Sequence, residues 1–376
     1  MIILLILIYS RCRISLFKTI GKLFRFFSQL IMNYIRLIKE EQGRLSEDSR
    51  FRHLCKIDIC DQNTLQHKIR SQFNRFGKDS EISTLVRELR QIDDVRCAHI
   101  VFTFFLGLFF YETSSLFHEA IERKASRRLI EAGHKDDFPF LWFLICLFHD
   151  LGYSQENLKE RSRVDTQWVN SRRIGHLSGV PILYGNVYKN YFNYRKSEFH
   201  LTDHGIYAGL SMYGDLCNIY RLHSNWNQNL DKLYNLASWV VLAHNIWFTL
   251  DTDTKKSQIY RNYKLEKLIL ETDGRNNVVK YPITLQEHPL LFLFCLVDLI
   301  EPMKKIGNAE CCNSIDFKLK DNTLTISSEL KCNIMEEYFK NIANASEWLC
   351  DVTKNTSQGI IIKLCYAMCA NYSQEF

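Results

Sequence analysis

The sequence feature that most limits the possible folds of this chain is a run of apolar residues that ends in a histidine and an aspartate. Residues 140–156 read FLWFLICLFHDLGYSQE. This pattern predicts an apolar helix that ends at His149 and Asp150, followed by a turn at Gly152. A helix that is apolar on every side is predicted to lie inside a helical core. His149 and Asp150 therefore present an imidazole and a carboxylate to one buried point, where the carboxylate can bridge two cations.

Three further apolar helical stretches each carry an isolated polar side chain. A single core histidine usually donates to a carbonyl group, and a single aspartate usually caps a helix or forms an ion pair, because a buried aspartate without a partner is costly. Taken with the His-Asp pair, they predict one mixed nitrogen and oxygen metal site, which suits Fe, Mn, Zn, Co or Ni better than Ca. The residues are His204 in FHLTDHGIYAGLSMYG (199–214), His244 in LYNLASWVVLAHNIW (233–247) and Asp298 in HPLLFLFCLVDLIEP (288–302).

These motifs, in this order, resemble the HD-domain superfamily of metal-dependent phosphohydrolases over residues 95–305. FHDLGY looks like the His-Asp pair of that family, DHGIYAG and LAHNIW look like its two additional histidine segments, and FCLVDLIEP looks like its final aspartate helix. The resemblance implies a helical core that binds one or two divalent transition-metal ions. It makes His149 and Asp150 the catalytic pair, and it implies the metal ligands His149, Asp150 and Asp298, with Asp150 bridging if two ions bind and His204 and His244 completing the second site.

Two histidines compete for the first ligand position of that family. His99 lies at the head of the very apolar stretch 95–112, VRCAHIVFTFFLGLFFYE. His118 lies 31 residues before His149, a separation closer to that of compact family members. The helix that follows His118 is charged, however, whereas the family fold needs a buried one. We therefore favour His99 and keep His118 as the alternative.

The chain is expected to be mostly α-helical, because it has only 15 glycines and 5 prolines in 376 residues. Residues 315–330 alternate apolar and polar side chains around Asp321–Asn322, which predicts a hairpin, and a helix (333–349) and an apolar strand (360–364) follow. The polar span 155–198 is predicted to be a long, partly irregular insertion. The expected units are an N-terminal segment (1–45), an HD-type helical bundle (50–305, core 95–305) and a small α+β subdomain (306–376).

The N-terminal segment carries most of the charge asymmetry of the chain. Residues 1–39 hold seven Lys or Arg and no acidic residue, whereas the whole chain has a net charge of +6. Residues 14–39 form a basic amphipathic helical pattern with a narrow polar stripe. Two interpretations stay open: residues 10–39 bind an anionic membrane surface, or their apolar face docks on the rest of the protein. The remaining chain is close to neutral, so nucleic acid is not an expected partner.

Cysteine usage indicates a reducing compartment. The chain has 13 cysteines, an odd number, and contains no CxxC pair. Several of them, such as Cys146 and Cys295, lie inside apolar helical stretches, where cysteine behaves as a small hydrophobic residue. We therefore expect a cytoplasmic protein, with membrane association through residues 10–39 as the open addition.

The expected function is hydrolysis of a small anionic phosphorylated substrate, a nucleotide or signalling nucleotide, as a phosphomonoester or phosphodiester. In such enzymes a metal lowers the pKa of a bound water from 15.7 toward about 7, which makes hydroxide the nucleophile at neutral pH. Two alternatives stay open. One is a di-iron oxygenase with the same fold, and the other is a non-catalytic membrane-surface or interaction protein built on the same scaffold.

Overall fold

The computed structural model describes residues 94–130, 138–156, 165–172, 174, 186–216, 228–275, 278–279, 283–302, 306, 311, 314–320, 323–344 and 361–366. The N-terminal segment (1–45), with its expected basic helix, lies outside these residues. The first part of the expected helical unit, residues 50–93, lies outside them as well.

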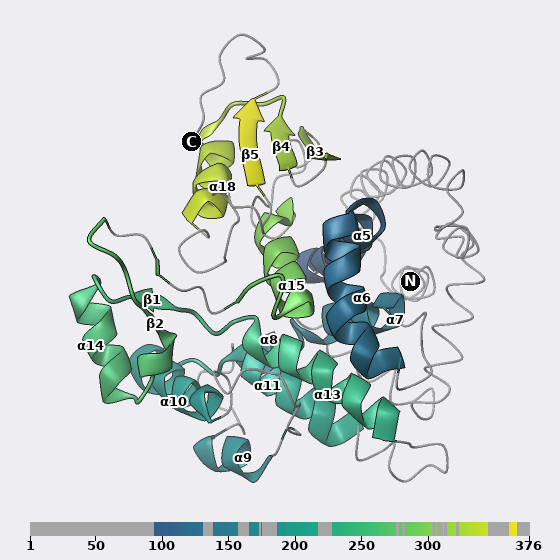
Figure 1. The fold of residues 1–376 in the computed structure, drawn as a ribbon. Helices are drawn as coiled ribbons and strands as arrows, with labels where there is room; N and C mark the ends of the chain where they lie inside the picture. Colours follow the sequence, from purple (N-terminus) through teal and green to yellow (C-terminus); the bar gives the residue numbers. More distant parts are fainter. Residues whose placement is uncertain are drawn as a thin grey trace, which may run out of the picture.

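Helices make up most of the described chain, and the sheets are small, as the composition predicts (Figure 1). A two-stranded parallel sheet pairs β1 (Thr249–Leu250) with β2 (Ile269–Leu270). A π-helical turn (η2, Met212–Leu216) and a 3₁₀ turn (η3, Glu266–Leu268) interrupt the α-helices. The α-helices of the main body are α5 (Asp94–Thr113), α6 (Ser115–Ile130), α7 (Phe138–Phe148), α8 (Tyr153–Glu156), α9 (Thr166–Ser171), α10 (Val187–Phe199), α11 (His204–Ser211), α13 (Gln228–Ala243), α14 (Thr254–Asn262) and α15 (Pro289–Ile300).

The core forms where α7 packs against α5 and α13, with α15 against α5 and α6. Close approach of α5 and α7 depends on Gly107, since a Cβ atom there would lie 2.1 Å from the Trp142 ring. Trp142 is fully buried, and its indole N–H donates to the Phe104 carbonyl over 3.0 Å. The most apolar helices of the chain, α7 and α15, therefore lie in the interior, where the site residues also lie.

Two parts of the span 155–198, which was expected to be partly irregular, are helical: residues Thr166–Ser171 form α9, and the last third forms α10. The aromatic residues that made this stretch look unusual supply one apolar face of the helix, which is buried against the core. Helical periodicity of the aromatic side chains therefore outweighs the polar residues between them. The buried residues of α10 are Val187, Tyr188, Tyr191, Phe192 and Tyr194.

The C-terminal part folds into a three-stranded sheet with one helix, in the strand order β3-β4-β5. The expected hairpin forms from β3 (Ile315–Lys320) and β4 (Thr323–Ser328), and β5 (Ile361–Tyr366) pairs with β4 in parallel. The crossover helix α18 (Asn333–Asn344) lies beside β5 (Figure 1). The Tyr338 hydroxyl donates to the Ile300 carbonyl over 2.5 Å, so this unit is hydrogen-bonded to the end of α15.

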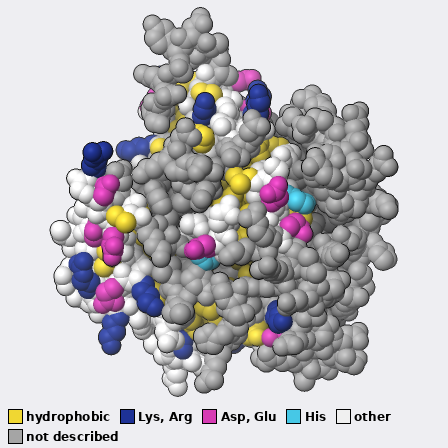
Figure 2. Space-filling model, in the orientation of Figure 1, with side chains coloured by type: hydrophobic (Ala, Val, Ile, Leu, Met, Phe, Trp, Pro, Cys, Tyr) yellow, Lys and Arg dark blue, Asp and Glu magenta, His cyan; other side chains and the backbone are white. Residues whose placement is uncertain are grey.

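Within the described part of the chain, no helix is both long and apolar enough to cross a bilayer. Cys146 in α7 and Cys295 in α15 are buried free thiols, and burial raises the pKa of both above the usual value for cysteine. Both thiols stay protonated and pack as small apolar groups. Figure 2 shows Lys and Arg side chains interspersed with Asp and Glu over the described surface of one face.

Candidate metal centre

His99 enters the core from the first turns of α5 and is fully buried. Its Nδ1 lies 2.6 Å from Oε2 of Glu301, which is also fully buried and follows the end of α15. An ionised carboxylate only accepts hydrogen bonds, so Nδ1 of His99 carries the proton. With the proton on Nδ1, the lone pair of the neutral His99 ring lies on Nε2, the atom that could bind a cation.

His149 and Asp150 follow directly after the last residue of α7, Phe148. The His149 backbone N–H still donates to the Ile145 carbonyl over 3.1 Å, so the helical geometry carries the imidazole into the core. Its Nδ1 donates to the Cys146 carbonyl over 2.7 Å, which places the lone pair of the neutral ring on Nε2. Nε2 of His149 lies 3.0 Å from Nε2 of His99 and 3.2 Å from Oδ1 of Asp150.

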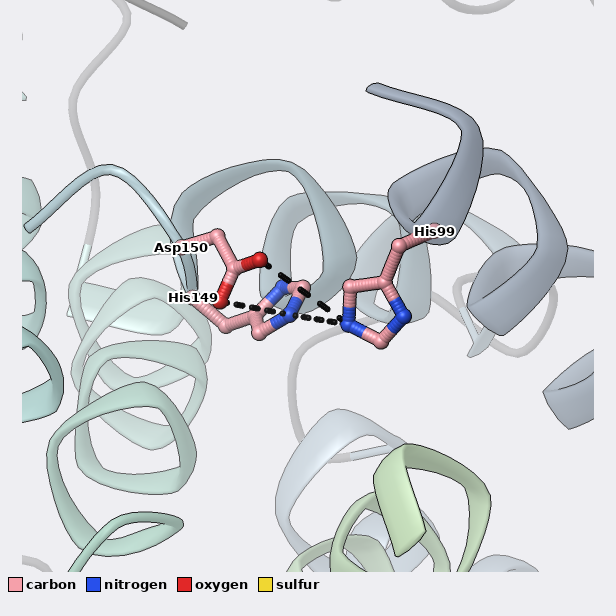
Figure 3. A group of neighbouring side chains, drawn as sticks. All are labelled: His99, His149 and Asp150. Atoms are coloured by element: carbon pink, nitrogen blue, oxygen red, sulfur yellow. Dashed lines mark hydrogen bonds and ion pairs between the residues drawn. The ribbon is translucent and has the colours of Figure 1, made fainter. Parts of the chain in front are cut away.

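Figure 3 shows the His99 ring facing His149 and Asp150 across the space between α5 and the end of α7. One ligand atom from each of these three residues lies within 4.8 Å of the others. Asp298, from the last turn of α15, adds Oδ1 at 3.0 Å from Nε2 of His99 and 3.9 Å from Nε2 of His149. The side chain of Asp298 is 19% exposed, whereas Asp150 is fully buried.

The donor set of this cluster fits a divalent transition metal. Two imidazole Nε2 atoms and the oxygens of two carboxylates converge, and in the neutral imidazole and ionised carboxylate forms all of them are lone-pair donors to a metal. Nitrogen and oxygen ligands together suit Fe, Mn, Zn, Co or Ni. A buried group of His99, His149 and Asp150 that can hold a metal ion is therefore present.

His244 extends the cluster from the end of α13. Its Nδ1 donates to the Val241 carbonyl over 2.6 Å, and its ring centroid lies 5.5 Å from that of His149. Burial, with smaller contributions from His204 and His149, lowers its pKa to about 3, so the ring is neutral at physiological pH. Nε2 of His244 is buried and has no hydrogen-bond partner among the described residues, so it also offers a lone pair.

His204, the first residue of α11, lies beyond His244, with ring centroids 5.3 Å apart. Gly205 permits this approach, since a Cβ atom there would lie 3.1 Å from Cε1 of His244. The Tyr153 ring stacks on His204 with a centroid distance of 3.9 Å. Nδ1 of His204 lies 3.2 Å from Oε2 of Glu156, which places a carboxylate behind this histidine.

A buried ion-pair network surrounds the His204 end. Arg195 lies 3.2 Å from Glu156 and 3.6 Å from Asp203, and Asn245 donates to Asp203 over 2.8 Å. Burial opposes ionisation of Glu156, but His204 and Arg195 outweigh it and lower the Glu156 pKa. Asp203 caps α11 by accepting from the Ile206 N–H, and burial raises its pKa against the opposing effects of His204 and Arg195.

The four histidines form a continuous row, His99–His149–His244–His204, with successive ring centroids 5.1, 5.5 and 5.3 Å apart. Asp150 and Asp298 lie at the His99 end. All six candidate ligands therefore lie along or beside this row, but among the described residues only His99, His149 and Asp150 have ligand atoms close enough together to form one potential metal-binding group. His118, the alternative first ligand, packs its ring against Tyr111 at 4.7 Å, and it is not a member of the potential metal-binding group found among the described residues.

Sequence reasoning missed the charged residues that contact the histidines from behind. Glu301 lies three residues after Asp298, so a carboxylate at helical spacing from a candidate ligand was the available signal. Asp203 immediately precedes His204, which is the usual position of a helix cap. Nothing in the sequence pairs Glu156 with Arg195, because they are 39 residues apart.

Comparison of the chain with protein-family models, with curated proteins and with solved structures finds no significant match.

Proposed function

We propose that this protein is an HD-type metal-dependent phosphohydrolase that acts on a phosphomonoester or phosphodiester. The observation that carries the proposal is the buried convergence of His99, His149 and Asp150, with Asp298 beside them, as a group that could hold a cation. The order of these ligands along the chain is the order that the HD-domain resemblance implies. The helix-rich fold is compatible with such a domain.

The residues suggest which groups would hold each ion. His99, His149, Asp150 and Asp298 would hold the first, and Asp150 with His204 and His244 the second. Bound divalent ions supply Lewis-acid activation of water and withdraw charge from phosphorus during in-line displacement. A serine, cysteine or threonine nucleophile is then not needed.

The protein residues determine how a substrate would approach. Asp298 is the partly exposed member of the cluster, whereas Asp150 and His149 are fully buried. A small anionic phosphate ester would therefore approach beside Asp298, with the other ligands behind it. Because the Nδ1 protons of His99 and His149 are bound by Glu301 and the Cys146 carbonyl, the rings keep their orientation while substrate enters. A nucleotide or signalling nucleotide is the proposed substrate class.

We further propose a cytoplasmic location, with residues 10–39 binding the protein to an anionic lipid surface. The proposal rests on the excess of basic residues over acidic ones and on the amphipathic pattern of this segment. A polybasic segment gains about 1 kcal/mol for each basic residue near an anionic surface.

Metal analysis of protein purified without chelators, followed by a screen of phosphate monoesters and diesters, tests the proposed activity. We expect at least one bound transition metal and metal-dependent release of phosphate or nucleotide. Asp150→Ala should abolish turnover, whereas Asp316→Ala, on the surface strand β3, should retain it. Wild-type hydrolysis by Asp150→Ala would exclude this mechanism. Bound iron with turnover that requires O₂ would favour an oxygenase instead.

A further inference from the structure

Two cysteines outside the candidate metal centre lie side by side at the base of the C-terminal hairpin. The Sγ atoms of Cys311 and Cys332 are 3.7 Å apart, and both side chains are thiols. Cys311 precedes strand β3, and Cys332 lies between β4 and the first residue of α18. The two residues are 21 positions apart in sequence, so the fold brings them together from the two ends of the hairpin.

Hydrogen bonds at the open end of the hairpin hold the two cysteine-bearing segments together. The strand pairing ends at Ile315 and Ser328, and beyond it the Glu329 N–H donates to the Ser314 carbonyl over 3.0 Å. The hydroxyl groups of Ser314 and Ser328 are buried and lie 2.7 Å apart. The Ser314 hydroxyl also lies 2.7 Å from the Cys311 carbonyl, to which it can donate, so the backbone at Cys311 is tied to the same end of the hairpin.

The Cys332 side is held by the helix that follows it. The Cys332 carbonyl accepts from the Glu336 N–H over 3.0 Å, which attaches this residue to the first turn of α18. Tyr338 of the same helix donates to the Ile300 carbonyl at the end of α15. Contacts that do not involve the thiols therefore fix both backbones, so the proximity of the two sulfur atoms is a property of the fold.

This arrangement suits a disulfide bond between the two cysteines. A disulfide requires a distance of about 2.05 Å between the sulfur atoms, which a side-chain rotation can reach when the backbones already lie close together. Cys311 is only 6% exposed, whereas Cys332 is half-buried, so a dissolved oxidant meets Cys332 first. We infer that Cys311 and Cys332 are an oxidation site, at which a low-molecular-weight disulfide such as glutathione disulfide forms a reversible bond between them.

The exchange proceeds in two balanced steps. The Cys332 thiolate attacks one sulfur of glutathione disulfide, so that a mixed disulfide forms and one glutathione thiolate leaves. The Cys311 thiolate then attacks Sγ of Cys332 and displaces the second glutathione as a thiolate. The two glutathione thiolates take up the two protons that the cysteines lose. Two cysteines are thus oxidised while one glutathione disulfide is reduced to two molecules of glutathione.

The new bond would close a loop that contains the whole β3–β4 hairpin and would join its base to the start of α18. Such a cross-link restricts the unfolded chain and thereby stabilises the folded one. In a reducing compartment, which we propose for this protein, the pair stays reduced until an oxidant accumulates. The inference depends neither on the proposed metal centre nor on the identity of a substrate.

Non-reducing peptide mapping of the full-length native protein tests the pair directly. Reduced protein is exposed to glutathione disulfide, its remaining thiols are alkylated, and trypsin then cleaves between the two cysteines after Lys318, Lys320 and Lys331. A disulfide joins the fragments 306–318 and 332–340, which mass spectrometry detects as one species. We expect this species in the oxidised sample and its disappearance after treatment with dithiothreitol.

Variants identify the partner of Cys332, because fragment 306–318 also contains Cys312. Cys311→Ser should lose the linked fragments, whereas Cys312→Ser and the matched control Cys365→Ser, on strand β5, should retain them. Oxidation should raise the Tm of the wild type and of both retaining variants by about 5–10 °C. The Tm of Cys311→Ser should not respond to the oxidant.

The outcomes of this experiment decide the inference without reference to metal or activity. Oxidised wild type that lacks the linked fragments would overturn it, and so would fragments that become linked only after the protein has been unfolded. Linked fragments that persist in Cys311→Ser would show that Cys311 is not the required partner. An oxidation-induced rise in Tm that is equal in Cys311→Ser and wild type would contradict the stabilising cross-link.

Discussion

Asp150→Asn should change the stability of the protein in opposite directions with and without metal. In the metal-free protein, the Asp150 carboxylate lies 3.2 Å from Nε2 of His149 and 3.9 Å from Nε2 of His99, in a fully buried position. Because both nitrogens are acceptors, an asparagine amide can donate where the carboxylate repels. We expect this variant to be more stable than the wild type in the presence of a chelator, by about 1–3 kcal/mol.

Addition of metal should make the wild type more stable than Asp150→Asn. At a free metal concentration of about 100 times Kd, binding stabilises the folded wild type by about 2.7 kcal/mol. In Asp150→Asn an amide NH₂ group, which is a poor metal ligand, replaces one carboxylate oxygen and the negative charge is lost, so this variant should gain little stability from metal. With about 2–4 °C of Tm for each kcal/mol in a domain of this size, the wild-type Tm should rise by roughly 5–10 °C.

Differential scanning fluorimetry with EDTA, and then with Co²⁺ or Mn²⁺, measures both effects on the same samples. The control is Asp253→Asn at the exposed N-cap of α14, where asparagine is as good a helix cap as aspartate. The metal-induced rise in Tm of this control should equal that of the wild type. Equal destabilisation of Asp150→Asn with and without metal would refute the reasoning, because Asp150 would then be a structural residue. An equal metal-induced Tm rise in variant and wild type would refute it as well.

Three further predictions concern packing, pH and the N-terminal segment. Gly107→Ala should destabilise the fold by about 1–3 kcal/mol in urea unfolding, because the added methyl overlaps the buried Trp142 ring, and an unchanged midpoint would contradict this packing. His244 has its pKa lowered from 6.5 to about 3, so below pH 6.5 the unfolded chain binds a proton that the folded protein excludes. Metal-free protein should therefore lose about 2 kcal/mol between pH 6.5 and 5 through this residue, and His244→Gln should show a shallower loss in urea titrations at each pH. Full-length protein should co-sediment with anionic vesicles and a chain lacking residues 10–39 should not, whereas equal binding, or insolubility of the shortened chain, would favour docking of this segment on the protein.

The sequence predicted those features that depend on local pattern. Apolar helices around His149, His244 and Asp298 could be recognised because nearly every neighbouring residue is apolar, and the hairpin around Asp321–Asn322 because its alternation has a period of two. These helices and the hairpin strands form as expected. Helix α10 was missed because its aromatic residues alternate with polar ones, and their burial depends on the surface they meet.

The partners of the histidines depend on distant parts of the chain and carry no local pattern. Glu301 is 202 residues from His99 in sequence, and Arg195 is 39 residues from Glu156. Periodicity identifies which face of a helix is buried, but it does not identify which residue of another helix lies opposite. The helix environment in the sequence was enough to favour His99 over His118. It was not enough to identify Glu301 as the partner of His99.

The hydrogen-bond partners of Nδ1 connect the histidine row to distant parts of the chain. Each histidine can present Nε2 only because its Nδ1 proton has an acceptor, and the two acceptor types come from different sources. Backbone carbonyls three residues earlier serve His149 and His244, so any histidine at the end of a regular helix has this acceptor available. Glu301 and Glu156 are side chains, so substitution can change their strength without changing the helix.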